Sequence, residues 1–158
     1  MDSPEVFKEL KSPFILTIFG ATGNLSHTKL IPGLLSLFNQ KMLPSEFFIV
    51  GYSRREMSDG EFRNLFTDQK KKEGWEEFSA HLYYQSGAFE NEEGYISLGK
   101  KLKEIDDRMN ACIARFFYLA TPPSHYSDIL DRLVSTKLSE GCGEHEDKWT
   151  RIIIEKPF

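Results

Sequence analysis

The strongest constraint on the fold is an apolar run that ends abruptly in a glycine-containing turn. Residues 14–19 are strand-forming, Gly20 and Gly23 follow, and apolar residues at helical spacing begin at Leu30. A strand followed by a glycine-rich turn and a helix is typical of the start of an α/β nucleotide-binding domain. A helix start attracts phosphate because it offers unpaired amides and the positive end of the helix dipole. An ordinary tight turn is the alternative, because the spacing is G-x-x-G rather than G-x-G-x-x-G.

Strands and helices then alternate along the chain. We expect further strands at 47–52, 82–86, 115–120 and 151–154, and helices at 59–72, 92–107 and 126–138. The first helix should be regular from about 29–31 to 40, after a tight turn. Ser58 with Glu61 forms a predicted capping box, and Ser124 is a predicted N-cap. This order predicts a single α/β domain with a Rossmann-like, doubly wound parallel sheet and helices on both faces.

The 158 residues are enough for one domain, which we place at 13–158 after a polar lead-in at 1–12. Net charge is −4, from 20 basic and 24 acidic residues, which argues against a nucleic-acid surface. No apolar run approaches the roughly 18 residues that span a membrane. The acidic start is unlike a signal peptide, so we expect a cytoplasmic protein. Cys112 and Cys142 could pair only if the fold brings them together, and we expect two reduced thiols. We assign no metal ligands.

The end of the second strand indicates the ligand. NAD-specific domains usually carry an acid there, which holds the ribose 2′-OH. Here Ser53, Arg54 and Arg55 follow instead, and a guanidinium group suits a phosphate. We therefore expect NADP, with NAD as a second candidate, and two ordinary surface arginines as the alternative. Segments after four strands should meet at one edge of the sheet, where ligands bind. They are residues 20–29, 53–55, 121–126 and 155–157.

These segments, in this order, resemble the N-terminal coenzyme domain of the glucose-6-phosphate dehydrogenase family over nearly all of the chain. The residues from Gly20 to Leu30 resemble its coenzyme loop, and Gly51 to Arg54 resemble its second-strand phosphate clamp. Residues 117–123 resemble its fourth-strand motif. Residues 151–158, which read Arg-Ile-Ile-Ile-Glu-Lys-Pro-Phe, resemble its fifth-strand motif and are the most specific of the set.

The resemblance implies a role for each matching residue. The coenzyme loop would hold the NADP pyrophosphate, and its residues are Gly20, Ala21, Thr22, Gly23, Asn24, Leu25, Ser26 and His27. Arg54 would face the adenosine 2′-phosphate, and Tyr126 would lie along the coenzyme. Lys156 would reach both the nicotinamide end and the sugar, and Lys29 would lie near the reaction site. Both lysines are therefore predicted substrate contacts as well.

The resemblance also implies an activity for the complete enzyme. It would oxidise glucose 6-phosphate to 6-phosphogluconolactone, the first step of the pentose phosphate pathway, and would be a homo-oligomer without nucleic-acid or membrane partners. In the family the proton-abstracting histidine follows the fifth strand, so we expect no catalytic residue and little activity in this chain. His27 and His125 are expected near the site as surface groups, whereas His81 and His145 are expected to have no role. Asn24 stands where the family usually has an acid.

Other readings remain open. The family typified by glucose–fructose oxidoreductase shares Ala-Thr-Pro and Glu-Lys-Pro segments but normally opens with G-x-G-x-x-G, which this chain lacks. A non-catalytic NADP-binding regulator of the atypical short-chain-dehydrogenase type would carry a third glycine where Ser26 stands. A binding module for something other than a nucleotide is the last class. The convergence of four polar or glycine- and proline-bearing segments at one sheet edge disfavours it.

Overall fold

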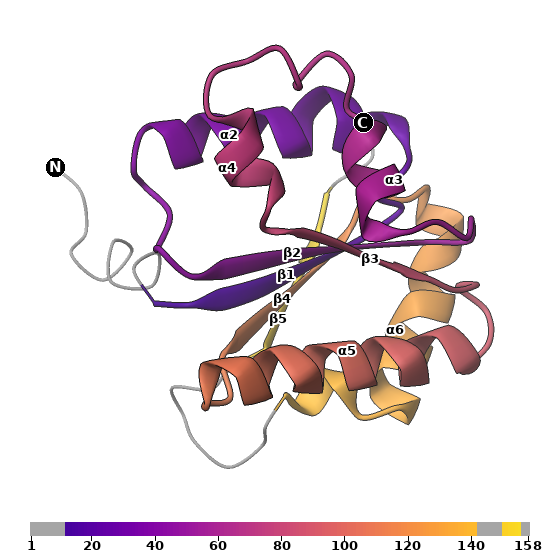
Figure 1. Ribbon diagram of the computed structural model, residues 1–158. Coiled ribbons are helices and arrows are strands. Elements are labelled where there is room, and N and C mark those ends of the chain that lie inside the picture. Colours follow the sequence, from indigo (N-terminus) through magenta and orange to yellow (C-terminus); the bar gives the residue numbers. More distant parts are fainter. Residues whose placement is uncertain (1–11, 142–149, 156–158) are drawn as a thin grey trace, which may run out of the picture.

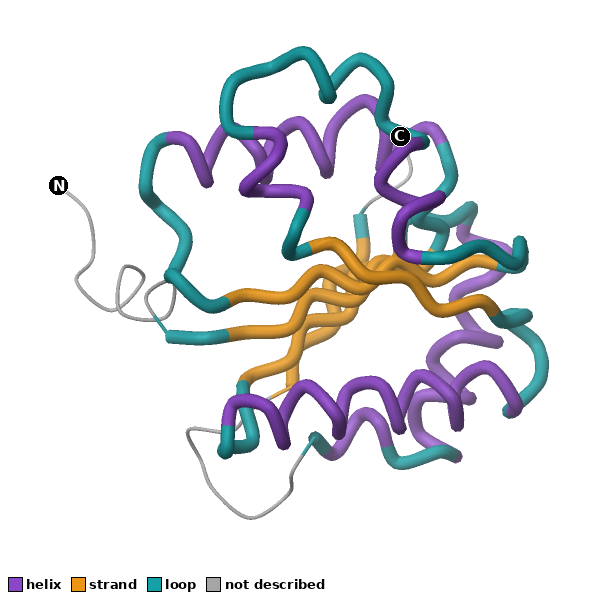
Figure 2. Tube along the Cα trace, in the orientation of Figure 1, coloured by secondary structure: helices purple, strands orange, loops and turns teal. Residues whose placement is uncertain are grey.

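The computed structural model describes residues 12–141 and 150–155, which form a parallel β-sheet between two layers of helices (Figure 1, Figure 2). Within these residues the sheet has five strands in the order β3-β2-β1-β4-β5, and all neighbours are parallel. The strands are β1 (Phe14–Phe19), β2 (Phe47–Ser53), β3 (Leu82–Ser86), β4 (Ala114–Leu119) and β5 (Thr150–Ile154). The prediction of a doubly wound α/β domain is confirmed.

Helices cover both faces of the sheet. On one face lie α2 (Ile31–Asn39), α3 (Asp59–Asn64) and α4 (Trp75–Ser79), and on the other lie α5 (Glu93–Met109) and α6 (Tyr126–Ser135) (Figure 1). Two short helical turns, η2 (Pro123–His125) and η3 (Leu138–Glu140), flank α6. No helix within residues 12–141 or 150–155 is both long and apolar enough to cross a membrane.

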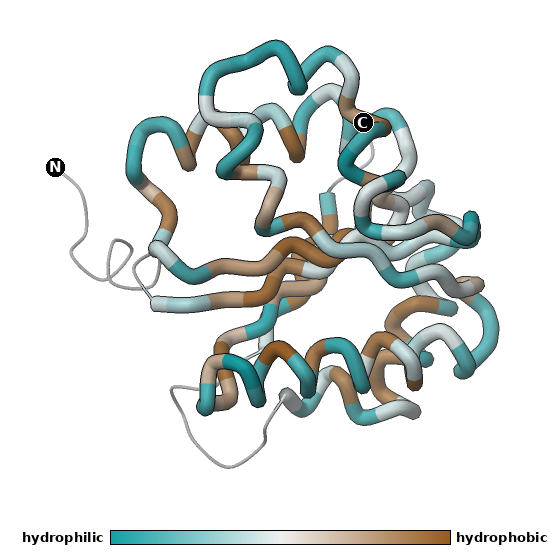
Figure 3. The backbone as a smooth tube through the Cα atoms, viewed as in Figure 1, coloured by the Kyte–Doolittle hydropathy of each residue, from teal (hydrophilic) through white to brown (hydrophobic). Residues whose placement is uncertain are grey.

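The core fills the space on each side of the two central strands. Every residue of β1 and β2 is buried, as a parallel strand covered on both faces should be. Figure 3 shows the hydrophobic residues gathered along these strands and the helices that pack on them. Helix residues in the core on the α2 side include Ile31, Phe62 and Phe78. Those on the α5 side include Tyr95, Leu102, Ile129 and Leu133.

The first helix begins earlier than predicted. Residues 24–39 are helical without a break, and a wider π-type turn, η1 (Ser26–Leu30), leads into α2. Pro32 has no amide hydrogen, and in a regular α-helix its ring would collide with the carbonyl group four residues back. In the wider turn the Ile31 amide bonds to the Ser26 carbonyl oxygen, five residues back. The expected tight turn up to Lys29 was wrong, and the helix starts directly after Gly23.

The helix predicted at 59–72 was wrong beyond Asn64, where α3 ends. The chain then turns and forms α4, which the sequence reading missed. No apolar residue stands between Phe66 and Trp75, so a longer helix would have had no face to bury there. The capping box is confirmed, because Ser58 and Glu61 exchange hydrogen bonds of 3.1 and 3.2 Å.

Candidate coenzyme site

The turn after β1 is packed between the ends of β2 and β4. Gly20 has a φ of 85°, a conformation that favours glycine. Its amide donates to the Tyr52 carbonyl oxygen at 2.9 Å, and the Ala120 amide donates to the Phe19 carbonyl oxygen at 2.9 Å. A Cβ atom on Gly20 would lie only 2.6 Å from the Ala120 carbonyl oxygen. The close approach of three strand ends therefore requires glycine at this position.

Gly23 joins the turn to the helix. Its amide donates to the Gly20 carbonyl oxygen at 3.0 Å. Its own carbonyl oxygen accepts from the His27 amide at 3.2 Å and from His27 Nδ1 at 3.0 Å, so Nδ1 carries the proton. Thr28 Oγ1 donates to the Asn24 carbonyl oxygen at 2.8 Å. These bonds fix the helix start at the carboxyl edge of the sheet, where its first amides can donate to an anion.

The residues of the predicted coenzyme loop differ in exposure. Ala21 and Ser26 are fully buried, whereas Gly23 and Asn24 are exposed. The His27 ring is half-buried, with its centroid 4.7 Å from that of Phe66. Lys29 is exposed on η1.

Ser53 is buried at the end of β2 within a chain of hydroxyl groups. Thr22 Oγ1 donates to Ser53 Oγ at 3.4 Å, and Ser53 Oγ is hydrogen-bonded to the Tyr84 hydroxyl group. The Tyr84 hydroxyl group donates to the Arg55 carbonyl oxygen at 2.5 Å. Burial raises the pKa of Tyr84, although the Ser53 hydrogen bond and the Arg55 charge oppose this. The phenol stays protonated, and β3 thereby holds the backbone that follows Ser53.

Arg54 extends from this backbone at the carboxyl edge. Its side chain is 69% exposed, and Nη2 lies 3.3 Å from a carboxylate oxygen of Glu90. Arg54 follows β2 and Glu90 follows β3, which are neighbours in the sheet. The sequence reading missed Glu90 because it did not fix the strand order. An acid shortly after the third strand is the signal that could have found it.

Tyr126 connects the start of α6 to the end of β5. Its hydroxyl group donates to the Glu155 carbonyl oxygen at 3.1 Å, and the Tyr118 hydroxyl group lies 3.4 Å from Glu155 Oε2. The expected N-cap at Ser124 was wrong, because no side chain caps α6. Lys156, the predicted contact to nicotinamide and sugar, lies outside the described residues.

The remaining histidines are placed by ring contacts. His125 lies with its ring centroid 5.2 Å from that of Phe89. His81 stacks on Phe47 at 3.8 Å, and its Nδ1 is bonded to the Phe47 carbonyl oxygen at 2.8 Å. Since Phe47 begins β2, His81 lies at the amino edge of the sheet, away from the candidate site. His145 is outside the part of the chain that the structure describes.

The sheet brings the predicted segments 20–29, 53–55 and 121–126 to one edge. Phe19 at the end of β1 stands opposite Tyr52 on β2 and Leu119 on β4. The strand order reverses between β1 and β4, and the crevice outside such a reversal is where ligands bind in open α/β sheets. The glycine turn lies at this crevice.

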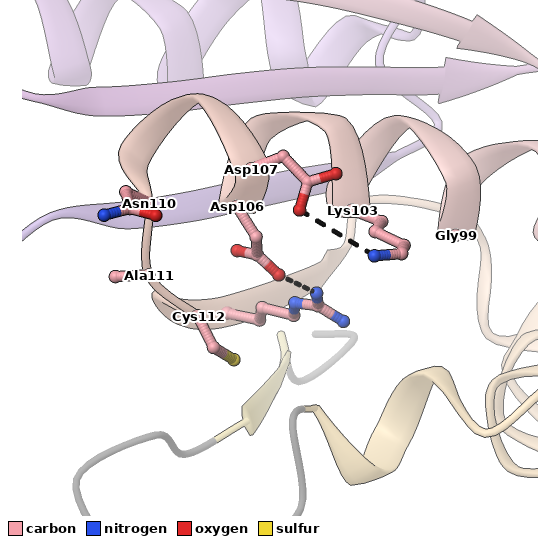
Figure 4. Close-up of a pocket in the computed structure, with 8 residues that line it drawn as sticks. Gly99, Lys103, Asp106, Asp107, Asn110, Ala111 and Cys112 are labelled. Carbon is pink, nitrogen blue, oxygen red and sulfur yellow. Dashed lines mark hydrogen bonds and ion pairs between the residues drawn. The ribbon is translucent and has the colours of Figure 1, made fainter.

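A cavity of about 550 Å³ lies at the opposite edge, between the end of α5 and the start of β4 (Figure 4). Arg115 pairs there with Asp106 at 2.6 Å, and Lys103 pairs with Asp107 at 3.7 Å. The four charges balance one another, and no predicted site residue lines the cavity. The candidate site is therefore the carboxyl edge of the sheet.

The prediction of reduced thiols was wrong for Cys112. This residue follows α5, lines the same cavity and is disulfide-bonded. Cys142 falls outside the described residues.

Residues 17–158 match the family described as "Glucose-6-phosphate dehydrogenase, NAD binding domain". The chain is 38% identical over 154 residues to the glucose-6-phosphate 1-dehydrogenase of Chlamydia pneumoniae, covering 92% of this chain and 30% of that protein. It is 32% identical over 156 residues to that of Caenorhabditis elegans, covering 95% and 29%. A solved structure described as glucose-6-phosphate dehydrogenase in complex with its substrate glucose-6-phosphate matches with a TM-score of 0.81 and 31% identity, covering 94% and 31%.

The chain thus spans less than a third of the length of these relatives. The match favours the predicted resemblance to glucose-6-phosphate dehydrogenase over the two alternatives. These were the family typified by glucose–fructose oxidoreductase and a regulator of the short-chain-dehydrogenase type. The match covers all four segments named from the sequence. The chain belongs to the NAD-binding domain family of glucose-6-phosphate dehydrogenase.

Proposed function

We propose that this chain binds NADP at the carboxyl edge of its sheet, with NAD as a weaker ligand, as the coenzyme domain of a glucose-6-phosphate dehydrogenase. The observation that carries the proposal is the position of Arg54. Its guanidinium group lies at the carboxyl edge shared with the glycine turn, on a backbone that Tyr84 holds from the next strand. A planar fork of donors at the end of β2 suits a 2′-phosphate.

The donor set at this edge fits a dinucleotide. The turn and helix start from Gly20 to His27 would hold the pyrophosphate at the positive end of the helix dipole. Tyr126 would lie along the coenzyme and Lys156 at its nicotinamide end. We take residues 13–158 as the coenzyme domain and 1–12 as a lead-in. This agrees with the start of β1 at Phe14.

The activity of the whole protein is part of the proposal. It would oxidise C1 of glucose 6-phosphate and give 6-phosphogluconolactone, and bound NADP would accept the hydride. Lys29 and Lys156 would position the hydroxyl groups of the sugar. Proton abstraction needs a base within hydrogen-bond reach of the 1-hydroxyl group, and no histidine of this chain matches the family's catalytic motif. We therefore expect this chain to bind coenzyme and to turn over little substrate by itself.

Two features of the whole protein stay predictions. One is a homo-oligomeric state of the complete enzyme, with glucose 6-phosphate as a partner and with neither nucleic acid nor a membrane. The other is a cytoplasmic location. It stays a prediction because the relatives do not share one compartment, and one from Arabidopsis thaliana is described as chloroplastic.

The proposal is tested by titrating this chain calorimetrically with NADP and NAD, with Arg54→Ala and Arg55→Ala as matched variants. Each variant removes one arginine charge, but only Arg54 is proposed to contact the coenzyme. Arg54→Ala should weaken NADP binding about tenfold or more, the loss expected for a charged hydrogen bond, and should leave NAD binding nearly unchanged. Arg55→Ala should change either affinity much less. A folded chain that binds neither coenzyme would refute the proposal.

A further inference from the structure

The ion pair between Arg54 and Glu90 brings an acid to the place where NAD-specific domains have one. Such domains carry their acid at the end of the second strand, where it holds the ribose 2′-OH. Here β2 ends at Ser53 and Arg54 follows it, and the acid comes from the segment after the neighbouring strand β3 instead. The Glu90 carboxylate lies 3.3 and 3.4 Å from Arg54 Nη2. An acid and a guanidinium group thus share the region in which the 2′ position of the adenosine ribose is recognised.

Glu90 is held in this place although its side chain is 53% exposed. Three consecutive backbone carbonyl groups, ending at Glu90 itself, accept hydrogen bonds from side chains of the core and of α6. These bonds run from Tyr52 to Ala88 at 2.8 Å, from Tyr95 to Phe89 at 2.9 Å and from Arg132 to Glu90 at 3.1 Å. The Gly87 amide also donates to the Ser53 carbonyl oxygen at 2.9 Å, which ties the start of the segment to the end of β2. The backbone that carries the carboxylate is therefore fixed beside Arg54.

The two coenzymes make opposite demands on this pair. The 2′-phosphate of NADP needs the guanidinium group, so it must displace the carboxylate and then remain close to its negative charge. The 2′-OH of NAD can donate a hydrogen bond to the carboxylate, which can stay in place. An exposed ion pair is weak, so Glu90 can be displaced, but the repulsion of a doubly charged phosphate remains.

We infer that Glu90 is a specificity-determining residue of the coenzyme site, which lowers the preference for NADP over NAD by competing for Arg54. The inference rests on the proposed function and names the residue that sets its coenzyme ratio. Removing the carboxylate charge should shift the chain toward NADP.

The test is a calorimetric titration of this chain with NADP and NAD, on the wild type, Glu90→Gln and Glu92→Gln, in a phosphate-free buffer. Glu92 is the matched control, an exposed glutamate two positions further on that loses the same charge. Glu90→Gln should raise the ratio of NADP to NAD affinity about fivefold, as expected for one charge a few ångströms from a dianion in water. Glu92→Gln should leave the ratio within about twofold, because its distance is greater and solvent screens it.

A second arm tests whether Glu90 acts through Arg54. In an Arg54→Ala background, Glu90→Gln should raise NADP affinity by less than it does in the wild type, because the competition for Arg54 is gone and only the repulsion of the phosphate remains. Suppose that the wild type binds NADP through Arg54. If Glu90→Gln then leaves the ratio of NADP to NAD affinity unchanged, or Glu92→Gln shifts it equally, the inference is overturned and the proposed function stays intact. A chain in which Arg54→Ala affects neither coenzyme would instead overturn the phosphate clamp itself, and the role of Glu90 with it.

Discussion

Gly20 and Ala120 approach so closely that a Cβ atom on Gly20 would lie 2.6 Å from the Ala120 carbonyl oxygen. Gly20 follows β1 and Ala120 follows β4, the two strands between which the order of the sheet reverses. The contact therefore shapes the floor of the crevice in which a dinucleotide would bind. Glycine is needed there both for the contact and for a φ of 85°.

Gly20→Ala should destabilise the fold by about 2 kcal/mol or more, because the new methyl group meets backbone in a strained conformation. It should also weaken coenzyme binding. Gly33→Ala is the control, since a Cβ at that exposed helical position would meet no atom within 4 Å apart from the backbone of its own helix and its chain neighbours. That variant should be stabilised by roughly 0.5–1 kcal/mol. Urea unfolding of both variants measures this, and equal losses in both would contradict the packing argument.

Tyr84→Phe should loosen the backbone that carries Arg54. The change leaves the Ser53 hydroxyl group and the Arg55 carbonyl oxygen without their shared partner, and each such loss costs about 1 kcal/mol. NADP affinity should fall more than NAD affinity, because only NADP needs the guanidinium group in place. Tyr83→Phe, on the same strand, is the control and should change the coenzyme ratio little. A ratio that Tyr84→Phe leaves unchanged would mean that β3 does not position Arg54.

The two ion pairs at the other edge should differ sharply in their effect on stability. Asp106 and Arg115 are nearly buried, with 12% and 9% of their side chains exposed, whereas Lys103 and Asp107 are 76% and 70% exposed. Asp106→Asn should cost about 3–5 kcal/mol, because Arg115 keeps a buried charge. Asp107→Asn should change the free energy of unfolding by less than about 0.5 kcal/mol. Denaturant titrations decide this, and similar losses would contradict the difference in burial.

Stability should fall at alkaline pH. Burial raises the pKa of Tyr52 and of Tyr95 above that of a free tyrosine, and nearby negative charges add to the effect. The folded state then holds these protons more tightly than the unfolded state. The stabilisation is therefore complete below about pH 10 and is lost as the pH rises toward the folded pKa.

The free energy of unfolding, measured by urea titration at several pH values, should decline above about pH 10. In Tyr95→Phe, which lacks one of the raised groups, the decline should be shallower, whatever the stability at neutral pH. An equally steep decline in both proteins would show that other groups cause the alkaline loss.

The regular parts of the fold follow from local patterns. Apolar runs predicted the five strands, and the Ser58–Glu61 pair predicted the start of α3. The errors fall where a local pattern competes with tertiary structure. Apolar spacing from Phe62 to Phe66 suggested a long helix. The residues after Phe66 are polar, so a helix continued through them would have no apolar face to bury. Pro32 suggested a late helix start, but a wider turn accommodates it.

The candidate site was only partly predictable for a different reason. The glycine turn and Arg54 lie in contiguous motifs, so the sequence reveals them. Glu90 contacts Arg54 only because β3 lies beside β2, and Tyr84 reaches Ser53 and Arg55 for the same reason. Strand order is a property of the whole sheet, and no short stretch of sequence encodes it.

The central claim is that a dinucleotide binds at the carboxyl edge of the sheet and not in the cavity beside α5. Its most direct test is an NMR titration of this chain with NADP that follows the backbone amide signals. The account predicts that the largest shifts occur at Gly20, Gly23 and Arg54, with little change at Asp107 and Asn110. Shifts concentrated at Asp107 and Asn110, or no shifts at saturating NADP, would contradict it.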